Sequence, residues 1–452
     1  MSDVTVETPA TENAGIRGYF SELGPTWLAG AIAAGPATMA TVITAGAVFG
    51  YAMLWVVVIA AILGATAQYL SMRLGLLTEQ GIVTTVEEHL GEFWAWVLVI
   101  DTVLASGLAQ IVIMKTVADV SAMVTGIDPW VWGIAWALVL ALGLAGGGYA
   151  IAELGAKVIV SAVVLAFIAS VFVVPTDGTA AVSGLVPSIP SDPGAALIAA
   201  GVLGGAVHIT LITMQTYTMR ARGWTRKEYD LGLFDVSTSM LLAFGLFSVA
   251  TFLVAASVLH PPEVPAAQID AVYAAEALGP LAGEYAAALF LVGLWGAAIS
   301  TLGANTVVPP YLVADKLDWG QDVSDSRFRA AVVAVALIGS LGAFLEGAFF
   351  PLLSLMLAFG LVGTPFALVV VCYLLNDSEA VPETNSTVAN VAAVVLIAVT
   401  ATLAADFVRD EFATVTTAPS SAAVVVFAAA IGLATLGLIG KYVLEQSRLG
   451  AT

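Results

Sequence analysis

The sequence predicts an all-α integral membrane protein built as a bundle of about a dozen apolar helices. Of its 452 residues, 60% are hydrophobic and only 10% are charged, whereas soluble domains carry roughly 45–50% apolar and about 25% charged residues. A folded chain of this length still exposes part of its surface, and these few charges could not cover that surface against water. Apolar stretches of about 20 residues, the length that crosses a bilayer, also recur along the whole chain. The outer surface is therefore expected to face lipid.

Twelve stretches have the length and composition of a membrane span. They cover residues 24–46, 49–74, 93–124, 130–146, 149–175, 193–219, 231–258, 280–313, 328–345, 348–375, 386–405 and 419–443. The first 22 residues are polar and acidic, and they lack the basic segment and short apolar core of a cleavable signal. We expect residues 1–22 to form a disordered cytoplasmic tail, followed by one transmembrane domain over residues 23–445.

The basic residues predict the orientation of the bundle. An even number of spans places both termini on one side, and cytoplasmic segments carry an excess of Lys and Arg. With the amino end inside, the inner segments hold Arg17, Arg73, Lys157, Arg220, Arg222, Arg226, Lys227, Lys316, Arg327, Arg329, Lys441 and Arg448. The outer loops hold Arg409 alone, and Lys115 lies within the third span. We therefore predict a multi-pass protein of the plasma membrane with both termini in the cytoplasm.

The charge balance and the single cysteine exclude several classes of function. A net charge of −19, from 33 acidic and 14 basic residues, argues against nucleic acid as a partner and resembles surfaces of proteins from high-salt cytoplasms. Cys372 alone cannot form a disulfide framework or a multi-cysteine metal site. No phosphate-binding loop or nucleophile–base pair stands out, so neither an enzyme nor a bound cofactor is predicted. The expected partners are the lipid bilayer and a transported ion or small solute.

Two spans are interrupted by their own composition. Gly35 and Pro36 lie in the middle of the first span, where proline removes a helical hydrogen bond. In the sixth span, Gly204 and Gly205 precede a polar run that begins at His208. The two interruptions are five spans apart, as expected if ten core helices form two inverted five-helix repeats, roughly 24–175 and 193–375, with two extra helices over roughly 386–443. Interrupted helices at matching positions of two repeats indicate a transporter's binding site, whereas Pro36 alone could be a tolerated kink.

Several blocks of sequence carry a resemblance to a known family. The first two spans are joined by a Gly-Tyr-x-x-Leu-Trp turn, present as Gly50-Tyr51 and Leu54-Trp55. The seventh span has an Asp near its start. The eighth and tenth spans match sequence blocks of the same family in order and spacing. Over nearly its whole length the chain resembles the natural resistance-associated macrophage protein (Nramp) family of divalent-metal transporters. The resemblance implies a LeuT-like inverted-repeat fold and a metal site where helices 1 and 6 unwind at mid-membrane.

The chain departs from the family at the residues that bind metal. The first-helix signature of the family is Asp-Pro-Gly-Asn, and Gly35, Pro36, Ala37 and Thr38 stand at its place. The sixth-helix signature is Met-Pro-His, and the corresponding stretch is Val207, His208, Ile209 and Thr210, aligned to within about a residue. The acids of the family's third helix, which pass the coupling proton, fall near Ile111 and Met114. The side chains of the usual metal ligands and proton relay are therefore absent.

The polar residues left in the spans give the candidate site. The predicted substrate site comprises Gly35, Pro36, Ala37, Thr38, Val207, His208, Ile209, Thr210, Thr213 and Asn305, with metal contacts from Thr38, His208 and Thr210. Asp101 and Asp235, ionisable groups at membrane depth, are candidates for an ion or proton pathway. For each there is a structural alternative: His208 could brace the unwound helix, Asp101 could be a paired structural acid, and the threonines could bond their own backbone.

These residues point to a transporter with an unusual ion preference. The resemblance implies a divalent metal ion moved by alternating access. Without a carboxylate and a thioether the site disfavours manganese and iron, which leaves a hydrated hard ion such as magnesium, carried without the usual proton relay. Two alternatives remain open: a transporter of a small organic solute such as an amino acid on the same fold, and a sensor that transports nothing.

Overall fold

The structure, a computed structural model, describes residues 35–146, 161–192, 194–263, 265 and 268–449. Every regular element in these residues is a helix. Nine helical stretches among them are long and apolar enough to cross a membrane, and Pro129–Ala145 and Ser161–Ser170 are shorter apolar helices. The predicted all-α membrane fold is thereby confirmed.

The first repeat begins with a broken helical hairpin and continues through three more helices. Its elements are α3 (Pro36–Phe49), η2 (Gly50–Met53), α4 (Leu54–Thr78), the short α5 (Ile82–His89), α6 (Glu92–Thr125), α7 (Pro129–Gly146) and the helix Ser161–Ser170. The predicted tail and the beginnings of the first and fifth spans lie outside the described residues.

The second repeat follows the short α9 (Gly178–Ser183). Its spanning elements are α10 (Ala195–Val207), α11 (Ile209–Ala221), α12 (Tyr229–Ser237), η4 (Thr238–Leu246), α13 (Phe247–Val258), α16 (Ala286–Thr306), α17 (Val308–Lys316), α18 (Ser326–Gly339) and α19 (Phe349–Leu374). Between α13 and α16 lie α14 (Ala271–Ala275) and α15 (Gly279–Ala282). The segment η4 is π-helical, which the sequence did not predict. Each of the twelve predicted spans overlaps at least one helix of the first repeat, of the second repeat or of the two C-terminal helices.

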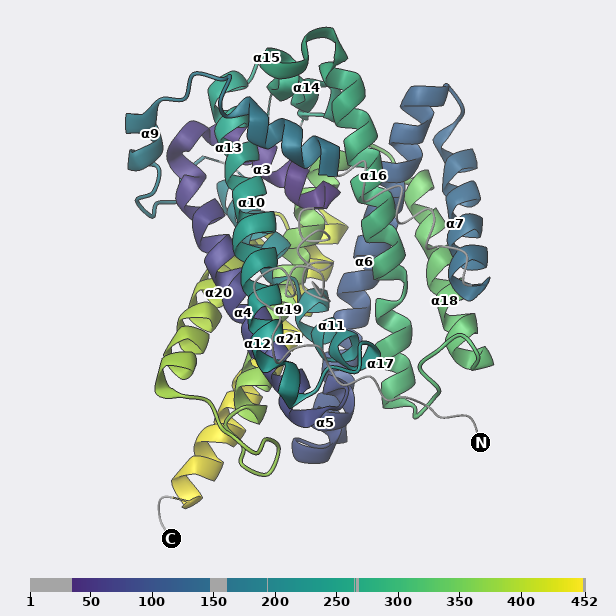
Figure 1. Ribbon diagram of the computed structural model, residues 1–452, viewed down its shortest axis with the longest axis vertical. Helices are drawn as coiled ribbons and strands as arrows, with labels where there is room; N and C mark the ends of the chain where they lie inside the picture. Colours follow the sequence, from purple (N-terminus) through teal and green to yellow (C-terminus); the bar gives the residue numbers. More distant parts are fainter. Residues whose placement is uncertain (1–34, 147–160, 193, 264, 266–267, 450–452) are drawn as a thin grey trace, which may run out of the picture.

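The extra helices α20 (Thr387–Ala413) and α21 (Pro419–Leu449) complete the bundle. Their most apolar windows are only 33% and 17% buried, whereas the windows of α10–α11 and α19 are 89% and 83% buried. Helices α10, α11 and α19 therefore lie at the centre of the bundle, and the extra helices present their apolar side chains outward. In Figure 1, α9, α14 and α15 gather at the upper end and α5 and α17 lie towards the lower end.

Glycines let the central helices approach closely. A Cβ on Gly204 would overlap the carbonyl oxygen of Leu357 on α19, and a Cβ on Gly205 would lie 2.6 Å from Oγ1 of Thr38 on α3. The paired glycines that suggested an interruption thus serve close packing of α10 against α19 and α3.

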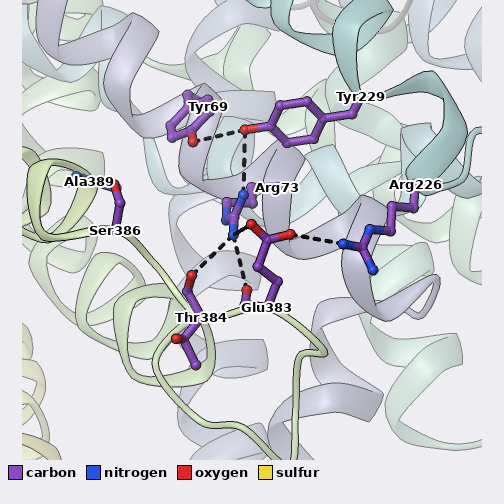
Figure 2. Close-up of polar contacts among 8 residues, drawn as sticks. All are labelled: Tyr69, Arg73, Arg226, Tyr229, Glu383, Thr384, Ser386 and Ala389. Atoms are coloured by element: carbon purple, nitrogen blue, oxygen red, sulfur yellow. Dashed lines mark hydrogen bonds and ion pairs between the residues drawn. The ribbon is translucent and has the colours of Figure 1, made fainter.

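A polar network ties three segments together where α4 ends (Figure 2). Arg73 donates hydrogen bonds to the carbonyl oxygens of Glu383 and Thr384, at 3.0 and 3.2 Å, in the connection between α19 and α20. Its other terminal nitrogen lies 3.5 Å from the Tyr229 hydroxyl, which bonds the Tyr69 hydroxyl at 2.9 Å. Arg226 pairs with the Glu383 carboxylate at 2.9 Å. We call these six residues the Arg73 network.

Candidate functional site

A cavity of about 310 Å³ lies where the helices of the two repeats meet. It is bounded by the start of α3, the middle of α6, the α10–α11 break, the α16–α17 junction and α19. The described lining residues are Gly35, Pro36, Ala37, Thr38, Ala109, Ile113, Leu144, Gly205, His208, Thr210, Leu211, Met214, Gln215, Thr218, Thr301, Gly303, Ala304, Asn305, Val307, Val308, Met356 and Leu357. We call this space the central cavity.

The first wall is the amino end of α3. Gly35 is extended, with ψ −176°, and the helix begins at Pro36. Proline suits a first helical position, because the N–H that it lacks would have no partner inside the helix. The hydroxyl-bearing Thr38 follows within the first turn, packed against Gly205. The predicted residues of the first-helix signature therefore all line the central cavity.

The second wall is the break between α10 and α11. Helix α10 ends at Val207, His208 adopts φ −54° and ψ 136°, and α11 starts at Ile209. The Val207 carbonyl oxygen accepts a 2.8 Å hydrogen bond from Oγ1 of Thr364 on α19. The interruption predicted in the sixth span is thus one residue wide, and α19 satisfies a carbonyl that the break would otherwise leave unpaired.

The ring of His208 is held from two sides. Its Nδ1 lies 2.9 Å from Oγ1 of Thr210 and accepts from the backbone N–H of Thr210 at 3.4 Å. Its Nε2 has no hydrogen-bond partner among the described residues and packs on α19, where a Cβ on Gly360 would overlap it. An Nδ1 that accepts leaves the proton of the neutral ring on Nε2. This placement favours His208 as a cap of α11 over a direct metal ligand.

On the third wall, Asn305 belongs to an amide network between α6 and α16. Asn305 donates from Nδ2 to the Ser106 carbonyl oxygen at 2.7 Å and to Oε1 of Gln110 at 3.1 Å. Gln110 donates in turn to Oγ1 of Thr306 at 2.8 Å. Asn305 itself lines the cavity. The sequence predicted Asn305 as a site residue but not Gln110. The one feature that could have indicated Gln110 is its amide side chain within an apolar span.

Three predicted site residues do not line the cavity. Val207 and Ile209 are fully buried in the protein core. The hydroxyl of Thr213 bonds the backbone oxygens of Ile209 and Thr210 at 3.0 and 3.3 Å. Sharing a helical face with His208 did not bring Thr213 to the cavity, because a threonine in a membrane helix readily bonds the preceding turn.

The two acids predicted for an ion or proton pathway, Asp101 and Asp235, do not line the cavity. Asp101 on α6 is fully buried, and a Cβ on Gly363 of α19 would overlap its carboxylate. Neither of its oxygens has a hydrogen-bond partner in the described part of the chain. Asp235 is fully buried near the end of α12. No Asp, Glu, Lys or Arg occurs among the described residues that line the cavity.

The cavity chemistry is therefore that of neutral oxygens, one imidazole, the thioethers of Met214 and Met356 and two helix amino termini. The expectation that no thioether lies at the site is thus wrong for the cavity as a whole, although neither methionine stands at the place of the sixth-helix signature. Within the described residues, no group of three or more His, Cys, Asp or Glu side chains could hold a metal ion. A bare divalent ion would lack compensating charge at this depth. A ligand that keeps its water, or one that brings its own charge, fits these walls better.

The chain is similar to known proteins in sequence and in fold. A family model described as natural resistance-associated macrophage protein-like matches residues 26–443. The chain is 28% identical over 302 residues to the divalent metal cation transporter MntH of Deinococcus radiodurans, an alignment that covers 65% of this chain and 68% of the relative. It is 24% identical over 360 residues to MntH of Bacillus subtilis, with 75% and 83% covered.

Solved structures show the same architecture. A mutant of the Eremococcus coleocola manganese transporter superposes with a TM-score of 0.73 at 15% identity, over 98% of both chains. Mhp1, a nucleobase-cation-symport-1 family transporter, gives 0.53 at 14% identity, over 90% of this chain and 96% of the other. These likenesses concern the fold, which is that of inverted-repeat transporters.

Proposed function

Because the chain belongs to the Nramp family, we propose that it carries a divalent metal ion across the membrane by alternating access, with the ion bound in hydrated form. The curated relatives bear the name of divalent metal cation transporters, and both they and the fold neighbours are transporters rather than enzymes. The observation that carries the finer part of the proposal is the neutrality of the central cavity.

The size of the cavity supports a hydrated ion. Six waters occupy about 180 Å³ at about 30 Å³ each, which a cavity of about 310 Å³ accommodates. Thr38, Thr210 and Asn305 would contact the water shell, and water-mediated contacts are nearly as favourable as direct ones. Magnesium gives up its water reluctantly, so it fits this mode of binding better than manganese or iron.

The third helix supports transport without the usual proton relay. Gln110 on α6 bonds Asn305, which lines the cavity, and an amide pair cannot release a proton near neutral pH. Asp101 packs against Gly363 rather than the cavity. We therefore expect divalent ion entry without a matched proton flux.

One observation favours a second candidate, a small organic solute with a carboxylate. The amino termini of α3 and α11 both border the cavity, and such half-helix ends carry partial positive charge that binds anionic substrate groups. Apolar side chains such as Ile113, Leu144 and Met356 form much of the remaining wall.

Uptake into proteoliposomes tests the proposal. Vesicles holding the purified chain and a magnesium-sensitive dye should take up magnesium in a saturable manner, while an enclosed pH dye reports no matched acidification. Asn305→Leu removes an amide that would contact the water shell of the ion. This variant should therefore take up less magnesium than the wild type. Saturable uptake of radiolabelled amino acids with no response to magnesium or manganese would contradict the proposal and favour the second candidate.

The orientation is also a proposal, and it rests on the basic residues. Single cysteines at exposed positions Glu263, Asp410 and Arg222, placed in a Cys372→Ser background, would report which side each loop faces. A membrane-impermeant maleimide added to intact cells should label the first two and spare the third. The reverse pattern would overturn the orientation with both termini in the cytoplasm.

A further inference from the structure

A second, polar cavity of about 330 Å³ lies beyond the central cavity. Its lining residues in the described part of the chain are Gln80, Gly81, Thr84, Arg220, Asp315, Asp318, Trp319 and Gln321. Both cavities border α11 and α17, and the step along α17 from Val308 in the central cavity to Asp315 in the second is seven residues, or about 10 Å. We call the second space the lower cavity, because α5 and α17 lie towards the lower end of the bundle in Figure 1.

The carboxylate of Asp315 joins three elements at the wall of the lower cavity. Its Oδ2 accepts a 2.7 Å hydrogen bond from the Tyr217 hydroxyl of α11 and a 3.1 Å bond from the backbone N–H of Thr84 in α5. Its Oδ1 accepts from the Thr84 hydroxyl at 2.8 Å and from Nε2 of Gln321 at 3.0 Å. An ionised carboxylate has about four acceptor positions, and four donors occupy them. Asp315 therefore holds helices together and is not an open ligand for a cation.

The start of α5 is built to receive this carboxylate. Gly81 precedes the helix, and the N–H of Thr84 in the first turn would have no partner inside the helix. A carboxylate suits this position, because the amino end of a helix carries partial positive charge. A Cβ on Gly81 would overlap Oδ2 of Asp315 and lie 2.6 Å from Cε1 of Tyr217. The glycine thus leaves the room in which these two side chains meet.

Helix α17 is held to α5 by formal charges, whereas α11 offers neutral groups. Nζ of Lys316, at the end of α17, lies 2.9 Å from a carboxylate oxygen of Glu87 on α5, and the lysine side chain is only 5% exposed. From α11 come the Tyr217 hydroxyl and Oγ1 of Thr216, which accepts from the Ile82 N–H at 3.1 Å. A pair in which both groups are charged is stronger than a bond with a neutral partner. Helix α11 is therefore the one that separates most easily.

Tyr217 lies on α11 where the central cavity gives way to the lower cavity. The next residue, Thr218, lines the central cavity, and Arg220 lines the lower one. Tyr217 is 2% exposed, and the centroid of its ring lies 5.7 Å from that of Tyr311 on α17. The two rings and the bond to Asp315 therefore close α11 against α17 at this level.

We propose that the hydrogen bond between Tyr217 and Asp315 is a latch that closes the transport path between the central cavity and the lower cavity, and that α11 moves away from α5 and α17 when the latch opens. The proposal rests on alternating access, the mode of transport proposed above. In that mode one group of helices moves against another around a fixed site. The lower cavity is then the vestibule at the end of the bundle where α4 ends, the cytoplasmic end in the proposed orientation.

Access of a small thiol reagent to the central cavity tests the latch without any transported ion. Ala304 lines the central cavity, and Ala304→Cys in a Cys372→Ser background places a single thiol there. A membrane-impermeant reagent is added to sealed vesicles of each orientation, and a reference cysteine at the exposed Arg222 identifies those that present the latch side. The Ala304→Cys parent should react slowly from that side. Tyr217→Phe should raise the rate about tenfold, because only the closed state loses a hydrogen bond to a charged group.

Two further variants serve as controls in the same background. Tyr311→Phe removes a hydroxyl from the neighbouring ring and leaves the bonds of Asp315 in place, so its rate should equal that of the parent. Thr84→Val removes a bond between the same carboxylate and α5, so it should raise the rate less than Tyr217→Phe does. If Tyr217→Phe does not fold, Asp315→Asn replaces it, and a faster reaction from the latch side is again expected.

Four results would overturn the proposal. They are rapid modification of the parent from the latch side, a rate that Tyr217→Phe leaves unchanged, equal increases from Tyr217→Phe and Tyr311→Phe, and an increase from Thr84→Val as large as that from Tyr217→Phe. The last result would show that α5 leaves instead of α11. Because no metal ion is present, each result stands whether or not the chain carries magnesium, which the uptake assay decides separately.

Discussion

The Arg73 network and the central cavity differ in how many formal charges they contain. At the end of α4, two arginines converge on Glu383 and its backbone, and most of the hydrogen bonds involve a formal charge (Figure 2). In the central cavity, the described lining residues carry no formal charge except what His208 could acquire, and backbone and amide groups hold the broken helices. Charge thus fastens segments to one another at the end of the bundle, whereas neutrality in the cavity lets a ligand with its own charge or water shell enter and leave.

Removal of Arg73 should have the largest effect on stability. Arg73 is nearly buried and donates to two carbonyl oxygens of the α19–α20 connection. Arg73→Ala should lower the free energy of unfolding by about 1.5 to 3 kcal/mol, the range for hydrogen bonds that involve charged groups. Thermal unfolding of the purified protein measures the loss.

Arg226 is the matched control for that change. It pairs with the same Glu383, but its side chain is 57% exposed, so Arg226→Ala should cost less than about 1 kcal/mol. If both variants lose the same free energy of unfolding, Arg73 contributes no more to stability than an exposed ion pair does.

The next largest effect should come from the bond that holds the α10–α11 break. Thr364→Val leaves the Val207 carbonyl oxygen without its partner on α19, and an unmet buried acceptor costs about 1 to 2 kcal/mol. Thr400→Val on α20 is the control, because that buried hydroxyl bonds only its own helix. If both substitutions shift the unfolding temperature equally, α19 does not stabilise the break.

The positions of the helices follow from the sequence, and so does the break, because the glycines and the polar run after them stand out in an apolar span. The partners of the polar side chains do not follow. These helices are apolar on nearly every face, so no amphipathic stripe indicates which neighbour each face meets. Thr213 was predicted beside His208 and instead bonds its own turn. The partners of Gln110 on α16 could not be predicted, because no sequence pattern pairs α6 with α16.

A smaller effect is expected on ligand affinity at the cavity wall. Thr210→Val removes a hydroxyl that borders the cavity, and the loss of one water-mediated contact should weaken divalent ion binding by about fivefold, or about 1 kcal/mol. Thr213→Val is the control, since Thr213 does not line the cavity. A larger loss from the control would mean that the ion binds behind α11 rather than in the central cavity.

A neutral cavity should bind a hydrated divalent ion weakly and should not favour manganese. Isothermal titration of manganese and of magnesium into the wild type and into Gly35→Asp tests it most directly, because the aspartate supplies a carboxylate at the start of α3. We expect weak binding of both ions by the wild type and markedly tighter manganese binding by Gly35→Asp. Micromolar manganese binding by the wild type, undiminished by excess magnesium, would show that the neutral cavity favours manganese after all.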